Sequence, residues 1–270
     1  MRLSGCIETL FVREHPSAEE RIRACAKSGL YGVEFWRWSD KSLEKVERAL
    51  DETGLALTFM SNEPRVPIVD AATHRDFING LRDSVRVATR LKASGLGILV
   101  DDRGIDGGDS PRAGVSRAEQ HAAIVVALKL AAPIAADSGL RLYVEPLNSV
   151  LDHKGHFLDR TPEGLDIVEE VGHPHVLLLY DMYHSTMMGE RPDEVIGDRA
   201  GLIGHVHVAD VPGRHEPGSG TIDWPAYMAT LAAKSYQGPI GLEYFPTGAT
   251  LESLHRARKA LSEGQSSRTA

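Results

Sequence analysis

The sequence predicts an α/β protein, a single (β/α)8 barrel of the TIM type, and three observations support this. Short apolar segments alternate with longer amphipathic ones along the chain, as in strand–helix–strand units with a parallel sheet. The 270 residues accommodate eight units of roughly 32 residues, the size expected for a closed barrel. The first apolar segment leads into IETLFVREH, which lacks the glycine-rich phosphate loop of an open, doubly wound sheet.

Each expected strand is a short apolar segment bounded by polar or turn-forming residues. In chain order the strands cover Leu3–Ile7, Gly32–Trp36, Ala56–Met60, Leu96–Val100, Leu140–Pro146, Val176–Asp181, Ile203–Ala209 and Pro239–Tyr244. The helices between and after them cover Ala18–Ser28, Ser42–Thr53, Ala71–Lys92, Ser116–Ser138, Thr161–Val171, Pro192–Asp198, Trp224–Lys234 and Thr250–Leu261.

Several helix boundaries carry specific signals. Ser17 and Glu20 have the spacing of a capping box, and Thr161 places a capping hydroxyl before a first-turn proline. Glycine stands where a helix is expected to end, as helix-stopping glycines do. These positions are Gly29, Gly54, Gly95, Gly139 and Gly172.

Residues 1–262 are expected to form the barrel domain, and residues 263–270 a flexible tail within the polar segment SEGQSSRTA. Two loops, around Asn62–Val69 and Asp101–Gly114, are expected to close the pocket and decide specificity. Cys6 and Cys25 are too few for a disulfide framework and are expected to be reduced core residues.

Composition and charge limit the partners of the protein. The net charge of −8, with acidic and basic residues interleaved, argues against nucleic acid or an anionic membrane as a partner. The N-terminal segment lacks the apolar run of a signal peptide, and no stretch approaches the roughly 20 apolar residues that span a bilayer. We expect a cytoplasmic homo-oligomer that acts on a small-molecule substrate.

Four consecutive expected strands end in, or carry, a carboxylate or an imidazole. The residues are Glu145, Asp181, His207 and Glu243, separated along the chain by 36, 26 and 36 residues. Each gap is about one strand–helix unit, so the side chains are expected to converge at the carboxyl end of the barrel, where barrel active sites lie. A single strand-end glutamate is more often an ion-pair partner than a ligand, but four in succession favour a shared site.

Three carboxylates and one imidazole form an oxygen-rich ligand set. Such a set suits one divalent metal ion, Mg²⁺ or Mn²⁺ foremost, although Co²⁺ or Zn²⁺ could also occupy it. The carboxylates would repel one another strongly without a cation. The sequence therefore predicts one divalent metal ion held by Glu145, Asp181, His207 and Glu243.

Other polar residues near the strand ends are candidates for substrate binding. Arg214, in the proline- and glycine-rich loop ADVPGRHEPGSGTIDW, could grip a substrate carboxylate or hydroxyls, or form a surface ion pair. Glu216 could orient Arg214 or hold the loop. His184 could polarise a substrate carbonyl, or be an exposed histidine. Trp36 could wall the pocket or serve packing, and His205 is as consistent with a supporting role as with catalysis.

Several segments resemble the xylose isomerase-like barrel superfamily, in its branch of hydroxypyruvate and 2-oxo-tetronate isomerases. They are GVEFW, VEPLN, DHKGHFLD, LYDMYH, HVHVADVPGRHEPGSGTIDW and GLEYFP, and the resemblance covers about residues 3 to 260. The resemblance implies that the metal site consists of Glu145, Asp181, His207 and Glu243. It further implies that Glu145 and Glu243 are the acid–base pair. It also implies that His184 and Arg214 contact substrate. His207 departs from the glutamine often found in the isomerase branch, and histidine there is usual in ketose 3-epimerases.

The resemblance implies isomerisation of the aldose–ketose type through an enediolate, with hydroxypyruvate to tartronate semialdehyde as the leading case. Glu243 is expected to remove the proton and Glu145 to deliver it. A ketose 3-epimerase or another sugar isomerase on the same site is the main alternative. A metal-dependent nuclease would need further histidine ligands and a basic surface, and a non-catalytic sugar-binding subunit would not need paired bases.

Overall fold

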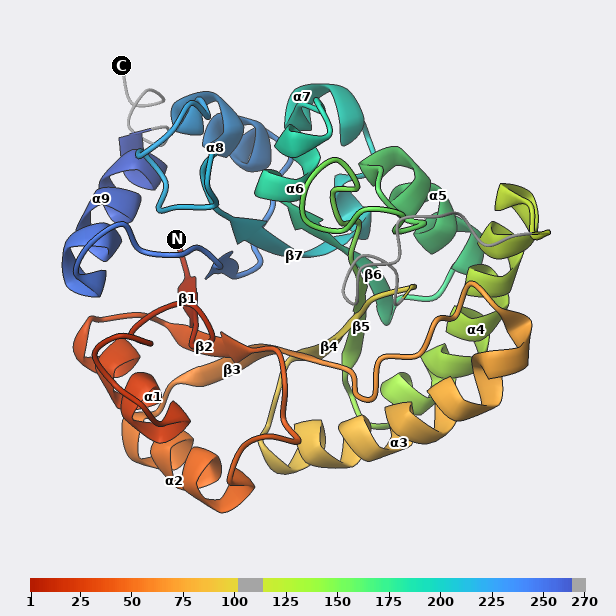
Figure 1. The fold of residues 1–270 in the computed structure, drawn as a ribbon, viewed down its shortest axis with the longest axis horizontal. Helices are drawn as coiled ribbons and strands as arrows, with labels where there is room; N and C mark the ends of the chain where they lie inside the picture. The colour runs from red at the N-terminus through yellow and green to blue at the C-terminus, as the bar shows by residue number, and fades with distance from the viewer. Residues whose placement is uncertain (102–113, 264–270) are drawn as a thin grey trace.

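Eight parallel strands close into a barrel in chain order, with β1 beside β8 (Figure 1). The computed structural model describes residues 1–101 and 114–263. The strands are β1 Leu3–Cys6, β2 Gly32–Phe35, β3 Ala56–Ser61, β4 Gly95–Ile98, β5 Arg141–Val144, β6 Val176–Asp181, β7 Ile203–Val208 and β8 Ile240–Leu242. The predicted (β/α)8 TIM barrel is confirmed.

Helices surround the strands on the outside of the barrel (Figure 1). They are α1 Ala18–Lys27, α2 Leu43–Thr53, α3 His74–Arg90, α4 Arg117–Asp137, α5 Thr161–Val171, α6 Met182–Met187, α7 Pro192–Val195, α8 Trp224–Ala233 and α9 Thr250–Glu263. Short 3-10 turns at Ala71–Thr73 and Ala200–Leu202 precede α3 and β7. The capping box at Ser17 and Glu20 is present.

The short helix α6 was not predicted. It begins directly after β6 because the Asp181 carboxylate accepts hydrogen bonds from the backbone N–H groups of Tyr183, at 2.7 Å, and His184, at 3.1 Å. A side-chain acceptor at this position satisfies amides that a helix start leaves without partners. The same carboxylate therefore ends a strand and starts a helix.

The prediction that Gly95 ends a helix is wrong. Helix α3 ends at Arg90, and Gly95 is the first residue of β4. A Cβ atom at Gly95 would lie 2.5 Å from the ring of Tyr143 and 2.6 Å from the carbonyl oxygen of Arg141, both on β5. Gly95 therefore allows two strands and a buried ring to approach closely. Gly54 and Gly172, by contrast, end α2 and α5 in the left-handed conformation, as predicted.

Helix α4 corrects the expectation that no stretch is long and apolar enough to span a bilayer, because it meets that test by length and composition. It nevertheless packs in the outer layer between α3 and α5 and against β5, with 44% of its apolar window buried. Ile124 and Leu128 are among its fully buried residues, and a proline, Pro133, lies within it. An apolar helix that packs one face on a barrel can therefore pass the same test of length and composition.

Two further predictions concern the core and the tail. Cys6 and Cys25 are buried free thiols, and burial raises the pKa of Cys25 to about 12. Helix α9 extends to Glu263, one residue into the segment expected to be the tail. Residues 264–270, and residues 102–113 of the second expected pocket loop, lie outside the described part of the chain.

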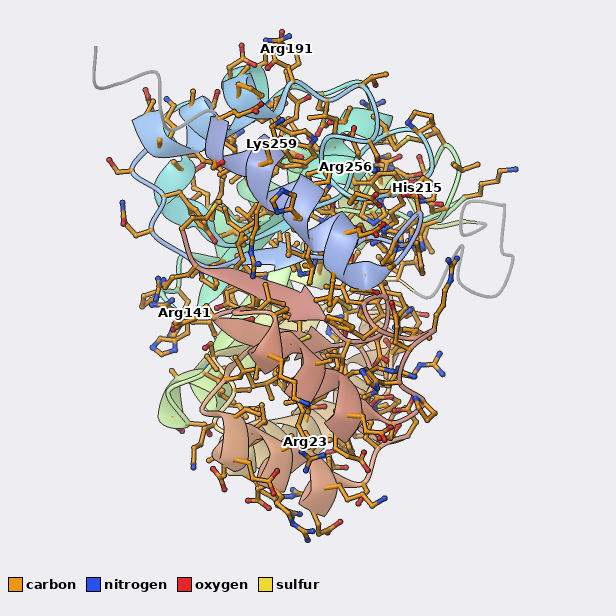
Figure 2. The ribbon with its side chains drawn as sticks, turned by 90° about the vertical axis from the view of Figure 1, so that its left-hand side faces the viewer. Arg23, Arg141, Arg191, His215, Arg256 and Lys259 are labelled. Carbon is orange, nitrogen blue, oxygen red and sulfur yellow. The ribbon has the colours of Figure 1, made fainter. Side chains whose placement is uncertain are left out.

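The two ends of the barrel lie on opposite sides in Figure 2. Arg141, the first residue of β5, marks the amino end, and His215, in the loop after β7, marks the carboxyl end. Every parallel strand points the same way, so all the segments that follow strands gather on the His215 side. The candidate site must be sought there.

Candidate active site

The structure brings together the four side chains whose convergence the strand spacing predicted. Glu145 directly follows β5, Asp181 ends β6, His207 lies in β7 and Glu243 directly follows β8. One ligand atom from each lies within 4.8 Å of the others, and all four residues are buried. The His207 Nδ1 atom lies 3.7 Å from Glu145 Oε1, 4.0 Å from Asp181 Oδ2 and 3.5 Å from Glu243 Oε2. These residues could hold one metal ion.

The orientation of His207 fits a metal ligand. Its Nε2 atom donates to Glu34 Oε2 at 3.0 Å, which fixes the tautomer and leaves the Nδ1 lone pair facing the carboxylates. Nδ1 is buried and makes no hydrogen bond within the described residues. A carboxylate behind a ligating imidazole is the usual arrangement at metal sites.

The electrostatics of the group also fit a cation. Burial raises the pKa of Asp181 to about 7, with Glu243 and Glu145 adding to the effect and Arg214 opposing it. Burial lowers the pKa of His207, but the carboxylates of Glu243 and Glu34 outweigh burial and raise it well above its ordinary value. Without an ion the cluster therefore takes up protons to reduce its negative charge. A divalent cation at the centre would do the same, so the residues fit the predicted metal.

Glu34 is a functional candidate that the sequence interpretation missed. It lies in β2, is 1% exposed, and also accepts hydrogen bonds from Ser4, from Thr58 at 2.8 Å and from His205 at 2.8 Å. Two features of the sequence could have identified Glu34. It is a carboxylate within the buried strand GVEF, and two histidines stand at alternate positions of β7. An ionised side chain there needs partners.

His205 and Gly241 support the same arrangement. The His205 contact with Glu34 favours the supporting role over a direct one, since the ring lies beneath the cluster and 0% of it is exposed. A Cβ atom at Gly241, on β8, would lie 2.3 Å from Glu34 Oε2 and 2.5 Å from His207 Cδ2. Only glycine leaves room for the Glu34–His207 pair beside this strand.

Two substrate-binding candidates contact Glu243 directly. The Trp36 indole N–H donates to Glu243 Oε1, and Arg214 Nη2 donates to Glu243 Oε2. Arg214 Nη2 also lies 3.9 Å from Asp181 Oδ2. Burial raises the pKa of Glu243, but the charges of Arg214 and His207 outweigh it and lower the value to about 2. Glu243 is therefore ionised at neutral pH.

The loop after β7 is built to place Arg214. Asp210 accepts hydrogen bonds from the backbone of Gly218 and Ile222 and from the Trp224 indole, at 2.8, 3.1 and 2.9 Å, which closes the loop on itself. Arg214 has a φ of 55°, an uncommon value for a residue with a side chain. This fixed loop turns the guanidinium back over the Tyr183 ring, 5.2 Å from its centre, and toward the cluster.

Glu216 lies away from the cavity. Its carboxylate accepts hydrogen bonds from the backbone N–H of Thr247, at 3.0 Å, and from the Thr247 hydroxyl, at 2.6 Å, and it pairs with Arg256 on α9. Of the two roles that the sequence left open, these contacts favour holding the loop over orienting Arg214. A direct contact with substrate has no support in this position.

His184 is buried, with 2% of its surface exposed, which excludes the exposed histidine considered above. Its Nδ1 atom accepts from the backbone N–H of Asn148 at 3.2 Å and lies 2.7 Å from the Asn148 side-chain nitrogen. The proton therefore resides on Nε2, which has no hydrogen-bond partner within the described chain. Burial and the nearby charge of Arg214 lower the pKa of His184 well below its usual value, so the ring is neutral.

A cavity of about 550 Å³ opens above the cluster. Its lining includes both glutamates, Glu145 and Glu243, as well as His184, Arg214 and Trp36. The volume suits a small molecule, and several polar side chains line it. A bound molecule there would meet two carboxylates, a neutral N–H donor and a guanidinium.

Over most of its length the chain is similar to two bacterial isomerases. A hydroxypyruvate isomerase from Escherichia coli is 28% identical over 242 residues, covering 87% of this chain and 90% of the relative. A 2-oxo-tetronate isomerase from Cupriavidus necator is 30% identical over 239 residues, again covering 87% and 90%. These similarities support an isomerase.

Solved structures and a family model complete the comparison. The crystal structure of a family 2 AP endonuclease from Brucella melitensis has a TM-score of 0.83 and 25% identity, and the match covers 94% of this chain and 97% of that one. The family model for the xylose isomerase-like TIM barrel matches residues 22–263, nearly the whole barrel. The chain therefore belongs to the xylose isomerase-like TIM barrel family.

Proposed function

We propose that the protein is a metal-dependent isomerase of a small hydroxy-carbonyl compound, with hydroxypyruvate to tartronate semialdehyde as the leading reaction. The observation that carries the proposal is that Glu145 and Glu243 line one cavity and also belong to a buried group of four residues that could hold a metal ion. The similarity to the two isomerases supports both the reaction type and a substrate of this size.

Glu145, Asp181, His207 and Glu243 would hold the ion, for which their mostly carboxylate set favours Mg²⁺ or Mn²⁺. When bound, such an ion supplies a positive charge that stabilises negative charge on substrate oxygens. Its identity is part of the proposal, and Co²⁺ or Zn²⁺ would satisfy the same ligands.

The two glutamates move the proton. Glu243, ionised at neutral pH, removes a proton from the hydroxymethyl carbon of hydroxypyruvate, which leaves an enediolate. Glu145 delivers a proton to the neighbouring carbon, and the hydroxyl proton passes to the former carbonyl oxygen. The product, tartronate semialdehyde, has the same atoms and oxidation level as the substrate, so no co-reactant is needed.

The surrounding residues hold the reacting groups in position. Trp36 and Arg214 each bind one oxygen of Glu243, which fixes the plane of its carboxylate. The neutral Nε2–H group of His184 is the donor available to a substrate carbonyl oxygen, because Asn148 occupies the other ring nitrogen. Positioning of this kind lowers the barrier by holding the atoms close to their reacting geometry.

The test is Glu243→Gln, which keeps the shape of the side chain and removes its basicity. We expect isomerisation of hydroxypyruvate to fall by about 10²–10⁴-fold, the range for losing a positioned acid–base group. Deuterium uptake from solvent into substrate, followed by NMR, measures proton removal even where little product accumulates. A metal-loaded, folded variant that isomerises at the wild-type rate would refute the proposal.

A ketose 3-epimerase is the second candidate, because the same pair of carboxylates can remove and return a proton at one carbon, and because His207 occupies the cluster. An assay of metal-loaded protein on hydroxypyruvate, 2-oxo-tetronates and free ketoses separates the two.

The fold and the bacterial isomerase relative support a soluble protein acting on a small molecule. The cytoplasmic location and the homo-oligomeric state stay predictions.

A further inference from the structure

A second arginine faces the cavity without an ionic partner. Arg65 lies in the loop after β3 and lines the same cavity as Glu145 and Glu243. Its side chain is half-buried, and within residues 1–101 and 114–263 it makes no ion pair. A partly buried guanidinium that forms no ion pair is uncommon, because removal from water disfavours an unpaired charge.

The other charges near Arg65 are already engaged. Arg214 Nη2 pairs with Glu243, so the charge of this guanidinium is already balanced by a carboxylate. The neighbouring carboxylate of Glu63 accepts hydrogen bonds from the backbone N–H groups of Trp38, at 2.7 Å, and Ser39, at 2.9 Å. Among the described residues that line the cavity, Arg65 is therefore the half-buried cation that remains available.

The loop that carries Arg65 is anchored on both sides of it. On one side, Pro64 packs so closely on α3 that a Cβ atom at Gly80 would lie 2.6 Å from its ring. On the other side, the carbonyl of Pro67 accepts the Thr73 hydroxyl at 2.8 Å. Two prolines and these contacts hold the guanidinium in a set place, which reduces the entropy lost when it binds a ligand.

The charge balance indicates what the ligand must be. The carboxylates of Glu145, Asp181 and Glu243 would be balanced by a divalent ion together with Arg214. The other carboxylates of the lining are engaged elsewhere, since Glu8 and Asp40 pair with Lys41, and the charge of Asp152 acts on Arg214. Burial lowers the pKa of Arg65, and Arg37 adds to this effect, while the charges of Glu145, Glu63 and Glu243 oppose it without cancelling it. An anion bound directly to the guanidinium would stabilise its charge further.

We propose that Arg65 binds the carboxylate of the substrate and thereby selects small hydroxy-oxo acids over uncharged ketoses. The inference rests on the proposed function, which supplies the reacting end of the molecule. The fork of a guanidinium matches the two oxygens of a carboxylate. A substrate held at one end by Arg65 and at the other by the cluster would span the cavity with its hydroxy-ketone group beside the glutamates.

The experiment compares hydroxypyruvate with dihydroxyacetone, which has the same hydroxy-ketone group but a hydroxymethyl group in place of the carboxylate. The readout is deuterium uptake from solvent, given as kcat/KM for each compound with Mn²⁺-loaded enzyme. In Arg65→Met we expect the preference for hydroxypyruvate to fall about 100-fold, the range for a hydrogen bond to a charged group. The rate with dihydroxyacetone should change little.

Two further variants test whether Arg65 itself causes the preference for hydroxypyruvate. Arg65→Lys keeps the charge without the fork, so we expect it to restore part of the preference. Arg37→Met removes an exposed arginine that lines the same cavity. We expect the preference to change by less than about threefold there, because exposed charges interact weakly. An equal loss in Arg37→Met would show that the general positive field, and not Arg65, selects the substrate.

The outcomes separate this inference from the proposed function. If both compounds exchange deuterium and Arg65→Met lowers both rates equally, the carboxylate assignment is overturned while the isomerase proposal stands. If wild-type enzyme exchanges neither compound, the proposed function fails. Calorimetric binding of hydroxypyruvate then decides about Arg65: weakening in Arg65→Met supports the inference, and unchanged affinity overturns it.

Discussion

The two halves of the barrel contribute to the site in different ways. Strands β5–β8 provide, at or near their carboxyl ends, the four residues of the candidate metal site: Glu145, Asp181, His207 and Glu243. Strands β1–β4 and the loops after them provide Glu34, Trp36 and Arg65, which hold the ligands or face the cavity. One half supplies the reacting groups and the other half supports them.

The contribution of β5–β8 is visible in the sequence, whereas that of β1–β4 depends on distant contacts. A carboxylate at a strand end can be recognised from its own strand, and four of them at regular spacing reinforce one another. Glu34 and Trp36 acquire their roles from partners 173 and 207 residues away, which meet them only when the barrel closes. Four predictions test whether the halves divide in this way.

The largest effect is expected from a ligand of the second half. Asp181→Asn removes one charge from the cluster, so we expect metal affinity to fall by more than about 100-fold, beyond the range for residues behind the ligands. Isothermal titration with Mn²⁺ measures it. Asp193→Asn, an exposed carboxylate beside Arg191, is the control. Unchanged Mn²⁺ affinity would remove Asp181 from the metal site.

A smaller effect is expected from the first half. Glu34→Gln keeps the shape but weakens the hold on His207, so Mn²⁺ affinity should fall by roughly 10–100-fold. Glu47→Gln, an exposed carboxylate on α2 that pairs with Arg90, is the control. A loss as large as that in Asp181→Asn would show that the halves do not divide as described.

Gly241→Ala tests how tightly Glu34 of the first half and His207 of the second half pack beside β8. The new methyl group would collide with Glu34 and His207, so we expect the free energy of unfolding to fall by about 1–3 kcal/mol, the usual cost of overpacking. Chemical denaturation measures it. Gly201→Ala is the control, since nothing lies within 4 Å of its added Cβ. Equal stability of the two variants would contradict the packing argument.

The smallest effect on activity is expected at Glu216. Glu216→Gln weakens the contacts with Thr247 and Arg256, so the free energy of unfolding should fall by about 1 kcal/mol while kcat/KM stays within about threefold. Denaturation and the hydroxypyruvate assay measure the two quantities. A loss of activity above about 30-fold with an unchanged unfolding midpoint would restore the substrate-binding role.

Several parts of the site depended on tertiary contacts. For Arg214 the sequence left open a substrate carboxylate, substrate hydroxyls or a surface ion pair, and in the fold its guanidinium forms a partly buried pair with Glu243. Glu216 stands two residues later in the same loop and points toward α9. Helix α6 arises because Asp181 caps it. In each case the outcome depends on which partner lies nearest in space, and local pattern does not encode that.

The sequence by itself determined the barrel and the end at which the site lies. Alternating apolar periodicity predicts strands and helices, and parallel strands direct their polar ends to one face, so spacing alone brings Asp181 and His207 together. The buried support by Glu34 and the position of Arg65 at the cavity became visible only in the folded structure. The physical reason is that these depend on contacts across the closed barrel, where distant segments exclude water together.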